Sequence, residues 1–291
     1  MKAVSATRME TFLAVASHGS VRRAATQLHV TEAAVSAAVA HVERQIGAKL
    51  VTRSGRGIHL TDAGRIYADY CHTILGLMKE AHAAVQQAEK GRLYIGVVAT
   101  AGETVVLSLL ASFRDRFPDV DIGLSVRPRD DLFTELRHHE TDLVIAGRPP
   151  HGAGLVIRAQ RASTLVLVGS PRHRTDARTE TWLLRGRGSG TRDTTLALLD
   201  RLGIEPPTLT LGSHGAVVAA TREGLGVTLV HEDAVEQDLA TGLLEVVPLD
   251  GTPLDRAWHV VTTKPATPTA ELFIDHITDA TRVGPHAFHA I

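Results

Sequence analysis

Cysteine and aromatic residues are scarce in this 291-residue sequence, which has one cysteine, Cys71, and 4% aromatic residues. A single cysteine excludes an internal disulfide framework, and a lone thiol on a helix is more typical of packing than of redox sensing. The sequence also has no run of 18 apolar residues, and it does not start with a basic segment followed by an apolar one. We therefore expect no membrane span and no export signal, and we predict a cytoplasmic protein.

Net charge is also small, at −1 for the whole chain, but it is unevenly distributed. Residues 1–66 contain nine Lys or Arg and four Asp or Glu, a local charge of +5 that leaves −6 for the remainder. A basic N-terminal segment on a neutral-to-acidic body is typical of a DNA-binding domain joined to another module.

Residues 20–36 have the spacing of two short helices joined by a tight turn. Ser20 can cap a first helix that runs to about Leu28, and Thr31 can cap the second. Small or apolar residues recur on the inward faces at helical spacing, namely Ala24, Ala25, Leu28, Val35, Val39, Val42 and Ile46. The start of the second helix then faces outward, as a recognition helix does in a major groove. A helical bundle without a nucleic acid partner is the alternative.

A basic hairpin is expected after this helix pair. Leu50–Leu60 reads as two short strands around a tip rich in Gly and Arg, which is typical of a wing that contacts DNA phosphates. We predict DNA contacts from both parts of the segment, at Ser20, Arg22, Arg23, Thr31, Glu32, Ala33, Ser36, Arg53 and Arg56.

A long helix is predicted next, over residues 61–89. Its apolar residues repeat at spacings of 4 and 3, at Tyr70, Ile74, Leu77, Ala81, Ala84 and Ala88. A narrow apolar seam on a long solvated helix indicates pairing with a second copy of the chain, although packing against the chain's own body is an alternative.

Beyond Gly91 the pattern changes to buried strands that alternate with amphipathic helices, which is typical of parallel α/β sheets. The pattern occurs twice, and the chain ends with a strand at 258–263 and a helix at 269–277. Two such lobes form a cleft that binds ligands at the carboxyl ends of the strands.

Residues 186–192, Gly-Arg-Gly-Ser-Gly-Thr-Arg, are the strongest ligand-binding candidate, because a Gly-rich turn before a helix can hold an anion with its backbone N–H groups. Two other strand ends add donors: residues 99–102 offer a hydroxyl and backbone amides, and Arg148 offers a guanidinium. The predicted effector residues are Thr100, Ala101, Arg148, Ser189, Gly190, Thr191, Arg192 and His214. Arg127 and Arg129 fit ligand binding and a solvated role equally well.

The sequence contains 16 histidines but no catalytic or metal-binding spacing that we can interpret. His138-His139-Glu140 is the densest cluster; adjacent helical residues point about 100° apart, so a solvated helix end is expected here. We predict no metal, no cofactor and no enzymatic activity. An enzyme and a freestanding solute-binding protein are the alternatives from other classes.

The first 65 residues resemble the N-terminal domain of LysR-type transcriptional regulators. The resemblance rests on Met9–Ser20, Ala24-Ala25, Val35-Ser36, the run from Val42 to Leu50, and Leu60–Gly64. It implies a linker helix and a homodimer, often assembled into a homotetramer. That family usually has Ser-Gln-Pro where this chain has Thr31-Glu32-Ala33, so we expect a different operator sequence.

The second half resembles the LysR branch that regulates Calvin-cycle carbon-fixation operons. The similar segments are Gly96–Ala101, Asp142–Pro150, Leu183–Arg192 and Trp258–Val261, whereas His214-Gly215 departs from the Asn-Glu usual in that branch. This resemblance implies a phosphorylated metabolite or nucleotide as effector, with a regulator of another pathway that binds a carboxylate as the alternative.

We therefore predict a ligand-responsive transcriptional regulator with a winged helix-turn-helix, a linker helix and two Rossmann-like lobes similar to a periplasmic binding protein. The expected boundaries are 1–60 for the DNA-binding domain, 61–90 for the linker, 91–160 with 265–291 for lobe I, and 161–264 for lobe II. The expected partners are double-stranded promoter DNA, a small anionic effector, further copies of the chain and RNA polymerase.

Overall fold

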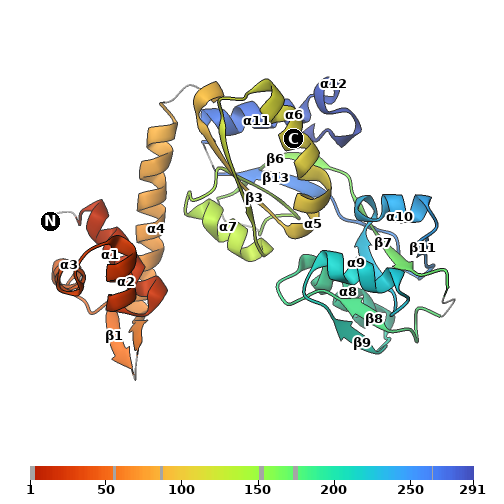
Figure 1. The fold of residues 1–291 in the computed structure, drawn as a ribbon, viewed down its shortest axis with the longest axis horizontal. Helices are drawn as coiled ribbons and strands as arrows, with labels where there is room; N and C mark the ends of the chain where they lie inside the picture. The colour runs from red at the N-terminus through yellow and green to blue at the C-terminus, as the bar shows by residue number, and fades with distance from the viewer. Residues whose placement is uncertain (1–3, 55–56, 86–87, 151–153, 173–175, 264) are drawn as a thin grey trace. The chain divides into compact units, whose positions relative to one another are not determined.

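The computed structural model describes residues 4–54, 57–85, 88–150, 154–172, 176–263 and 265–291 (Figure 1). The chain divides into two compact units, Met1–His82 with His138–Glu140, and Ala83–Arg137 with Thr141–Ile291. No helix among the described residues combines the length and the apolar character that crossing a lipid bilayer requires.

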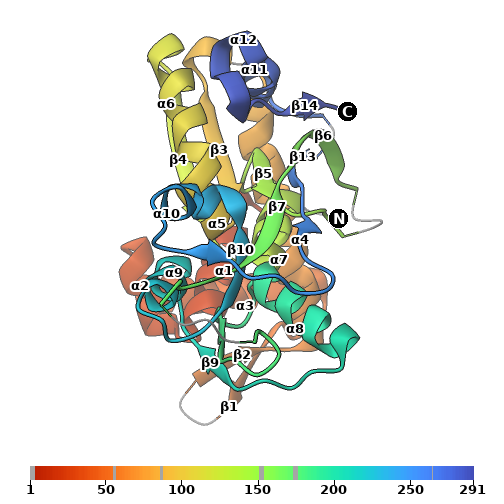
Figure 2. The same cartoon turned by 90° about the vertical axis from the view of Figure 1, so that its right-hand side faces the viewer.

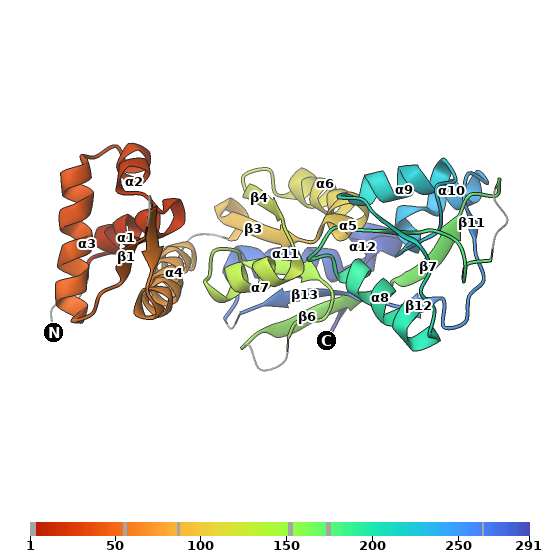
Figure 3. The same cartoon turned by 90° about the horizontal axis from the view of Figure 1, so that it is seen from below.

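The first unit contains the predicted helix pair, a further helix before it, the wing and the start of the linker (Figure 3). The two wing strands pair antiparallel, with Val51 opposite Leu60 and Arg53 opposite Ile58. Its elements are α1 (Ala6–His18), α2 (Val21–Leu28), α3 (Glu32–Ile46), β1 (Val51–Ser54), β2 (Gly57–Leu60) and α4 (Asp62–Ala83).

Small side chains let the three short helices pack closely. Ala24 and Ala25 of α2 are buried against Val15 of α1 and against Val35 and Val39 of α3. Of the predicted inward residues of α3, Val35, Val39 and Val42 are buried, but Ile46 is 45% exposed. The prediction for Ile46 was wrong because α3 ends there, at the Gly47 cap, beyond the helices it packs on.

Helix α4 is shorter than the residues 61–89 predicted for it. It ends at Ala83, and Ala84 and Val85 form a turn. Beyond Leu77 the predicted apolar seam consists of alanines only, and the Val85 side chain is 84% exposed. Little apolar surface is therefore buried here to stabilise another helical turn.

The described residues of lobe I form one sheet in the order β14-β6-β13-β5-β3-β4 (Figure 2). The strands β3, β4 and β5 are parallel, as predicted, whereas β6, β13 and β14 run antiparallel to their neighbours. The bounds are β3 (Arg92–Val97), β4 (Asp121–Val126), β5 (Leu143–Ala146), β6 (Val156–Arg161), β13 (Trp258–Thr262) and β14 (His289–Ala290).

Helices cover both faces of this sheet. Leu143 and Ile145 of β5 pack with α6 and α11 on one face, while the alternate residues Val144 and Ala146 pack with α7 on the other. The lobe I helices are α5 (Ala99–Ala101), α6 (Leu107–Arg116), α7 (Arg129–Arg137), α11 (Pro268–Thr278) and α12 (Ala280–Val283).

Lobe II is a mixed α/β lobe, not a purely parallel one. Strand β7 (Thr164–Gly169) pairs antiparallel with β10 (Thr228–His231), β11 (Glu245–Val246) and β12 (Leu254–Asp255). The parallel pair β8 (Trp182–Leu184) and β9 (Thr208–Thr210) joins them through a bridge between Trp182 and Val227. Its helices are α8 (Gly190–Leu202), α9 (His214–Arg222) and α10 (Glu236–Ala240).

The chain crosses between the two lobes at residues 162–163 and again at 256–257. It is therefore back in the lobe I sheet at Trp258, before the boundary after residue 264 that the sequence predicted. The difference arises because β13 lies between β5 and β6 and pairs antiparallel with both, whereas the sequence pattern indicated only parallel strands.

Glu43 joins α3 to the first wing strand. Its carboxylate is 8% exposed and accepts hydrogen bonds from the N–H of Leu50 (3.0 Å) and Val51 (3.3 Å) and from Lys49 Nζ (2.7 Å). Burial acts to raise the pKa of Glu43, but these hydrogen bonds outweigh it, so the pKa lies below its ordinary value. The bonds therefore stabilise the fold at neutral pH, and that contribution is lost as pH falls through the lowered pKa.

We expect Glu43→Gln to lower the stability of the first unit by about 1–3 kcal/mol near pH 7, because an amide offers one acceptor oxygen and no charge. The difference from the wild type should shrink as pH falls through the lowered pKa of Glu43, where the wild-type carboxyl takes up a proton. Hydrogen exchange of the Leu50 and Val51 amides would measure the effect. Trp182 and Trp258 both lie in the second unit, so their fluorescence provides the control. Equal amide protection at pH 7 would contradict the prediction.

Candidate DNA-reading surface and ligand cleft

The helix-turn-helix is capped as predicted. Ser20 Oγ accepts from Arg23 N at 3.4 Å, and Thr31 Oγ1 accepts from Ala34 N at 3.2 Å. Between the helices, His29 takes a left-handed backbone conformation with φ of 55°, which turns the chain. These contacts confirm the predicted caps and set the start of α3 outward.

The side chains predicted to contact DNA are accessible. Arg22, Arg23, Thr31, Glu32, Ala33, Ser36 and Arg53 are exposed and Ser20 is half-buried, whereas Arg56 lies outside the described residues. Ser36 of α3 and Arg53 of β1 line one concave area together with Lys49, which the sequence analysis did not select. Lys49 lies between α3 and β1, so no helical or strand periodicity marked it in the sequence.

A cavity of about 260 Å³ lies between the two lobes of the second unit. Its walls come from the segments after β3, β4, β5, β8 and β9, and from the crossover that carries Arg256. These segments follow the carboxyl ends of their strands, which is where α/β folds bind ligands. The cavity therefore lies where the sequence predicted a ligand cleft.

Positive charge dominates the lining, which includes five arginines and, among the described residues, no Asp or Glu. Two of the arginines have partners on lobe I. Arg127 pairs with Glu135 at 2.7 Å, and Arg129 pairs with Asp130 at 3.1 Å and donates to the Arg148 carbonyl at 2.7 Å. Arg187 is exposed.

The other two arginines, Arg185 and Arg256, are half-buried, and neither forms an ion pair with any described carboxylate. Burial lowers the pKa of both, and the nearby Arg129 lowers that of Arg256 further. Arg185 Nε and the indole N–H of Trp258 are buried without a hydrogen-bond partner among the described residues. Buried donors of this kind usually have a partner, so the cleft is arranged for a group that accepts hydrogen bonds.

Two glycines make room for Arg256. A Cβ built at Gly190, where α8 begins, would lie 3.2 Å from Arg256 Nη2, and one at Gly147, after β5, would lie 3.6 Å from it. The Arg256 guanidinium thus lies close both to the end of β5 in lobe I and to the start of α8 in lobe II.

Four of the predicted effector residues line the cavity, namely Thr100, Ser189, Gly190 and Thr191. Ser189 Oγ also caps α8 by accepting from Arg192 N at 3.4 Å, which orients the first amides of that helix. The other four lie outside the lining. Ala101 is buried, Arg148 is exposed, and Arg192 donates to the Arg185 carbonyl at 2.9 Å and to Thr210 Oγ1 at 3.2 Å.

His214, the last of these four, is buried beside Arg185, and burial followed by that charge lowers its pKa to about 4. His231, which lines the cavity, stacks on Trp258 with ring centroids 4.1 Å apart and contacts Ser163 Oγ through Nδ1 at 2.8 Å. Burial and then Arg256 lower the pKa of His231 to about 3. Both imidazoles are therefore neutral at pH 7, and the charge of the cleft comes from arginine.

Sequence reasoning missed Arg185, His231, Arg256 and Trp258 as lining residues. Arg185 immediately precedes the Gly-rich turn at residues 186–192, so extending that motif by one residue would have included it. Arg256 had no such signal, because it lies in the crossover between β12, a two-residue strand that the sequence pattern did not show, and the predicted strand β13.

Two protein families match consecutive parts of the chain. Residues 6–65 match the family described as "Bacterial regulatory helix-turn-helix protein, lysR family", and residues 86–282 match "LysR substrate binding domain". The chain belongs to the LysR family, and it is a DNA-binding transcriptional regulator with an effector-binding domain.

Curated relatives carry names that agree with this assignment. The transcriptional regulator CfxR of Cupriavidus necator is 33% identical, over 93% of this chain and 90% of its own length. The RuBisCO operon transcriptional regulator of Acidithiobacillus ferrooxidans is 30% identical, over 95% and 94%. They confirm the resemblance to regulators of carbon-fixation operons and the prediction of a regulator, not an enzyme.

Solved structures show the same fold. A full-length OxyR variant of Pseudomonas aeruginosa superposes with a TM-score of 0.69 at 20% identity, covering 95% of each chain. The CcmR regulatory domain of Synechocystis, in complex with 2-PG, superposes with a TM-score of 0.58 at 24% identity, covering 64% of this chain and 94% of that domain. The predicted fold class is thereby confirmed.

We expect Arg256→Met to leave the unfolding free energy of the ligand-free protein unchanged or to raise it by about 1 kcal/mol, because a charge without a partner is removed from a half-buried site near Arg129. Urea unfolding followed by tryptophan fluorescence would measure the change.

Arg161→Met is the matched control for this measurement. Arg161 is 13% exposed and pairs with Asp233 at 2.7 Å, so its loss should destabilise the protein by about 1–3 kcal/mol. If Arg256→Met costs as much as Arg161→Met, Arg256 has a structural role that its contacts do not show.

Proposed function

We propose that the effector of this regulator is a small molecule with at least two negative charges, held in the cleft by Arg185 and Arg256. The observation that carries the proposal is the pair of half-buried arginines without carboxylate partners. A guanidinium presents a planar set of donors that matches phosphate and carboxylate oxygens. An anion in the cleft would offset the cost of holding these charges away from water.

The start of α8 supplies a second set of donors. Helix N-termini attract anions through free backbone N–H groups and the helix dipole, and here Ser189 and Thr191 add hydroxyls beside those groups. A volume of about 260 Å³ suits a small metabolite better than a dinucleotide. A phosphorylated sugar or acid fits this set best, and a dicarboxylate is the second candidate. The 2-PG complex of the CcmR domain supports a small anionic ligand for this domain.

We infer that the ligand acts by bridging the lobes. Lobe II contributes Arg185 and the start of α8, lobe I contributes Arg127 and Arg129, and Arg256 comes from the crossover between them. An anion that contacts all three favours a more closed arrangement of the lobes, and its effect is limited by its differential affinity for the closed and open arrangements.

Pairing of α4 with a second copy would present two reading surfaces to a two-fold operator. In support, an apolar stripe on α4 is exposed in the single chain, formed by Ile66, Tyr70, Ile74, Leu77 and Met78. We propose regulation of carbon-fixation genes, in keeping with the RuBisCO operon relatives, and action in the cytoplasm, where promoter DNA is accessible.

A thermal-shift series with three- to five-carbon sugar phosphates and dicarboxylates tests the effector proposal. A ligand at 100 times its Kd should stabilise the protein by about 2.7 kcal/mol. Arg256→Met or Arg185→Met should weaken its binding by about 10-fold or more, because charge-assisted hydrogen bonds are lost.

Arg148→Ala is the control, because Arg148 is exposed outside the lining although the sequence predicted it as an effector residue. Equal losses of affinity in Arg148→Ala and Arg256→Met would overturn the assignment of the site to the arginines of the cavity.

The wing proposal is tested by the salt dependence of DNA binding. Replacing Arg53 and Arg56 by Ala should weaken binding across operator sequences and reduce the slope of log K against log salt by up to about 1.8 per reading surface, because two phosphate contacts are lost. Replacing the exposed Arg114 of α6, in the second unit, by Ala provides the control. An unchanged slope in the double variant would show that the wing does not contact DNA.

A further inference from the structure

Three histidine–carboxylate contacts join α4 to residues 138–140 within the first unit. His72 Nδ1 lies 2.5 Å from Glu140 Oε1, His138 Nε2 lies 2.6 Å from Asp69 Oδ1, and His139 contacts Glu80. The side chains of His138 and His139 are only 12% and 14% exposed, so the solvated helix end expected from the sequence is wrong. The adjacent histidines do point to different partners, as their spacing predicted.

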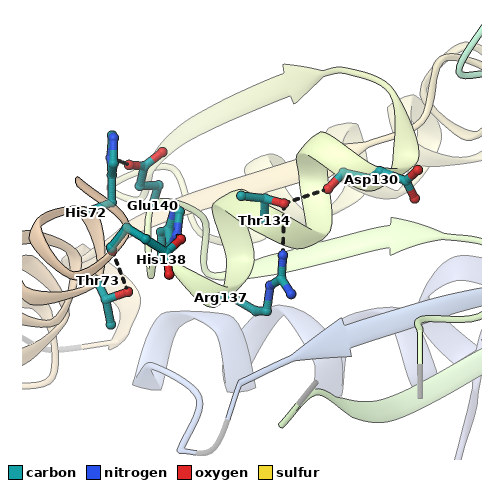
Figure 4. Close-up of polar contacts among 8 residues, drawn as sticks. His72, Thr73, Asp130, Thr134, Arg137, His138 and Glu140 are labelled. Carbon is teal, nitrogen blue, oxygen red and sulfur yellow. Dashed lines mark hydrogen bonds and ion pairs between the residues drawn. The ribbon is translucent and has the colours of Figure 1, made fainter. Parts of the chain in front are cut away.

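Two of these contacts converge on one place. His72, His138 and Glu140 bring a ligating atom each within 4.8 Å of one another, and the two imidazole rings stack with centroids 5.2 Å apart (Figure 4). Asp69 lies three residues before His72 on the same face of α4, and its carboxylate contacts His138 Nε2. Two imidazoles and the Glu140 carboxylate thus surround one small volume, and Asp69 lies beside it at His138.

The backbone holds these groups in place. A Cβ at Gly76, one helical turn beyond His72, would lie 1.8 Å from the His138 carbonyl oxygen, so only glycine permits this approach. Helix α4 and residues 138–140 are therefore in direct backbone contact beside the cluster. The φ of 56° at His139 turns the chain so that His138 and Glu140 both reach α4.

We propose that His72, His138 and Glu140 form a binding site for a divalent transition metal ion such as Zn²⁺, with Asp69 supporting His138. Imidazole nitrogen and carboxylate oxygen bind Zn²⁺ at about 2.0–2.2 Å, which places tetrahedral ligand atoms about 3.3 Å apart. The 2.5 Å contact between His72 and Glu140 needs to open by less than about 1 Å to admit the ion. On binding, the ion takes the place of the proton in this contact, and that proton passes to the other ring nitrogen or to solvent.

The mixed nitrogen and oxygen donors define which ions fit. Mg²⁺ and Ca²⁺ prefer sites made of oxygen alone, whereas imidazole favours Zn²⁺, Ni²⁺ and Co²⁺. His139 and Glu80 lie outside the set, and a bound ion would fix residues 138–140 to α4 more firmly than the hydrogen bonds do.

Zinc binding to the full-length protein at pH 8 tests the proposal. A chromophoric chelator that competes for Zn²⁺ should report one ion per chain. His72→Ala and His138→Ala should each weaken binding by about 100-fold or more, since even supporting residues around such sites contribute about 10–100-fold. Co²⁺ should give the visible spectrum of a tetrahedral ion in the wild type and lose it in both variants.

His82→Ala, on the same helix but outside the cluster, is the matched control and should bind as the wild type does. Glu140→Gln keeps the size of the side chain and removes its charge, so it tests the site even if an alanine variant unfolds. The proposal is overturned if the wild type binds no more Zn²⁺ than the His72→Ala/His138→Ala double variant, or if excess Mg²⁺ displaces Zn²⁺ as readily as Ni²⁺ does.

Discussion

Two half-buried guanidinium groups without carboxylate partners are the constraint around which the second unit is built. Arg185 follows β8 of lobe II and Arg256 lies in the crossover between the lobes, yet both line the cavity between them. The cavity lining around them supplies donors: the start of α8, the Trp258 indole, and histidines kept neutral by burial and by the same arginines. Glu103 and Asp193 act on the two arginines electrostatically but form no ion pair with them among the described residues. Half-buried charges without ion-pair partners are expected to cost stability in the free protein, which is common at binding sites.

The reading surface of the first unit depends on a different kind of contact. It presents its polar groups outward, while one buried carboxylate, Glu43, holds α3 against the wing strand through backbone N–H groups. The position of the wing relative to the recognition helix thus rests on an ionised side chain that touches no base. Apolar packing adds to this contact, because Leu50 packs with Val42, and Val51 and Ile58 pack against Val35 and Val39.

Local patterns predicted most of the fold. The caps at Ser20 and Thr31, the wing strands and the parallel strands β3, β4 and β5 follow from spacing within short stretches. The antiparallel insertion of β13, the short extent of α4 and the packing of His138–Glu140 depend on contacts between distant residues, which a single sequence does not display. The cleft was predictable where a Gly-rich turn marked it, at Ser189 to Thr191, but not where a lone Arg256 follows a two-residue strand.

The place of Arg256 in a crossover has a consequence for how such a regulator changes over time. The residue lies in a crossover between the lobes and also lines the cavity between them. If the proposed effector binds there, a substitution of Arg256 changes the ligand preference and the connection between the lobes together. The exposed residues of α3 belong to the other unit, so a change of operator preference there leaves the cavity lining as it is.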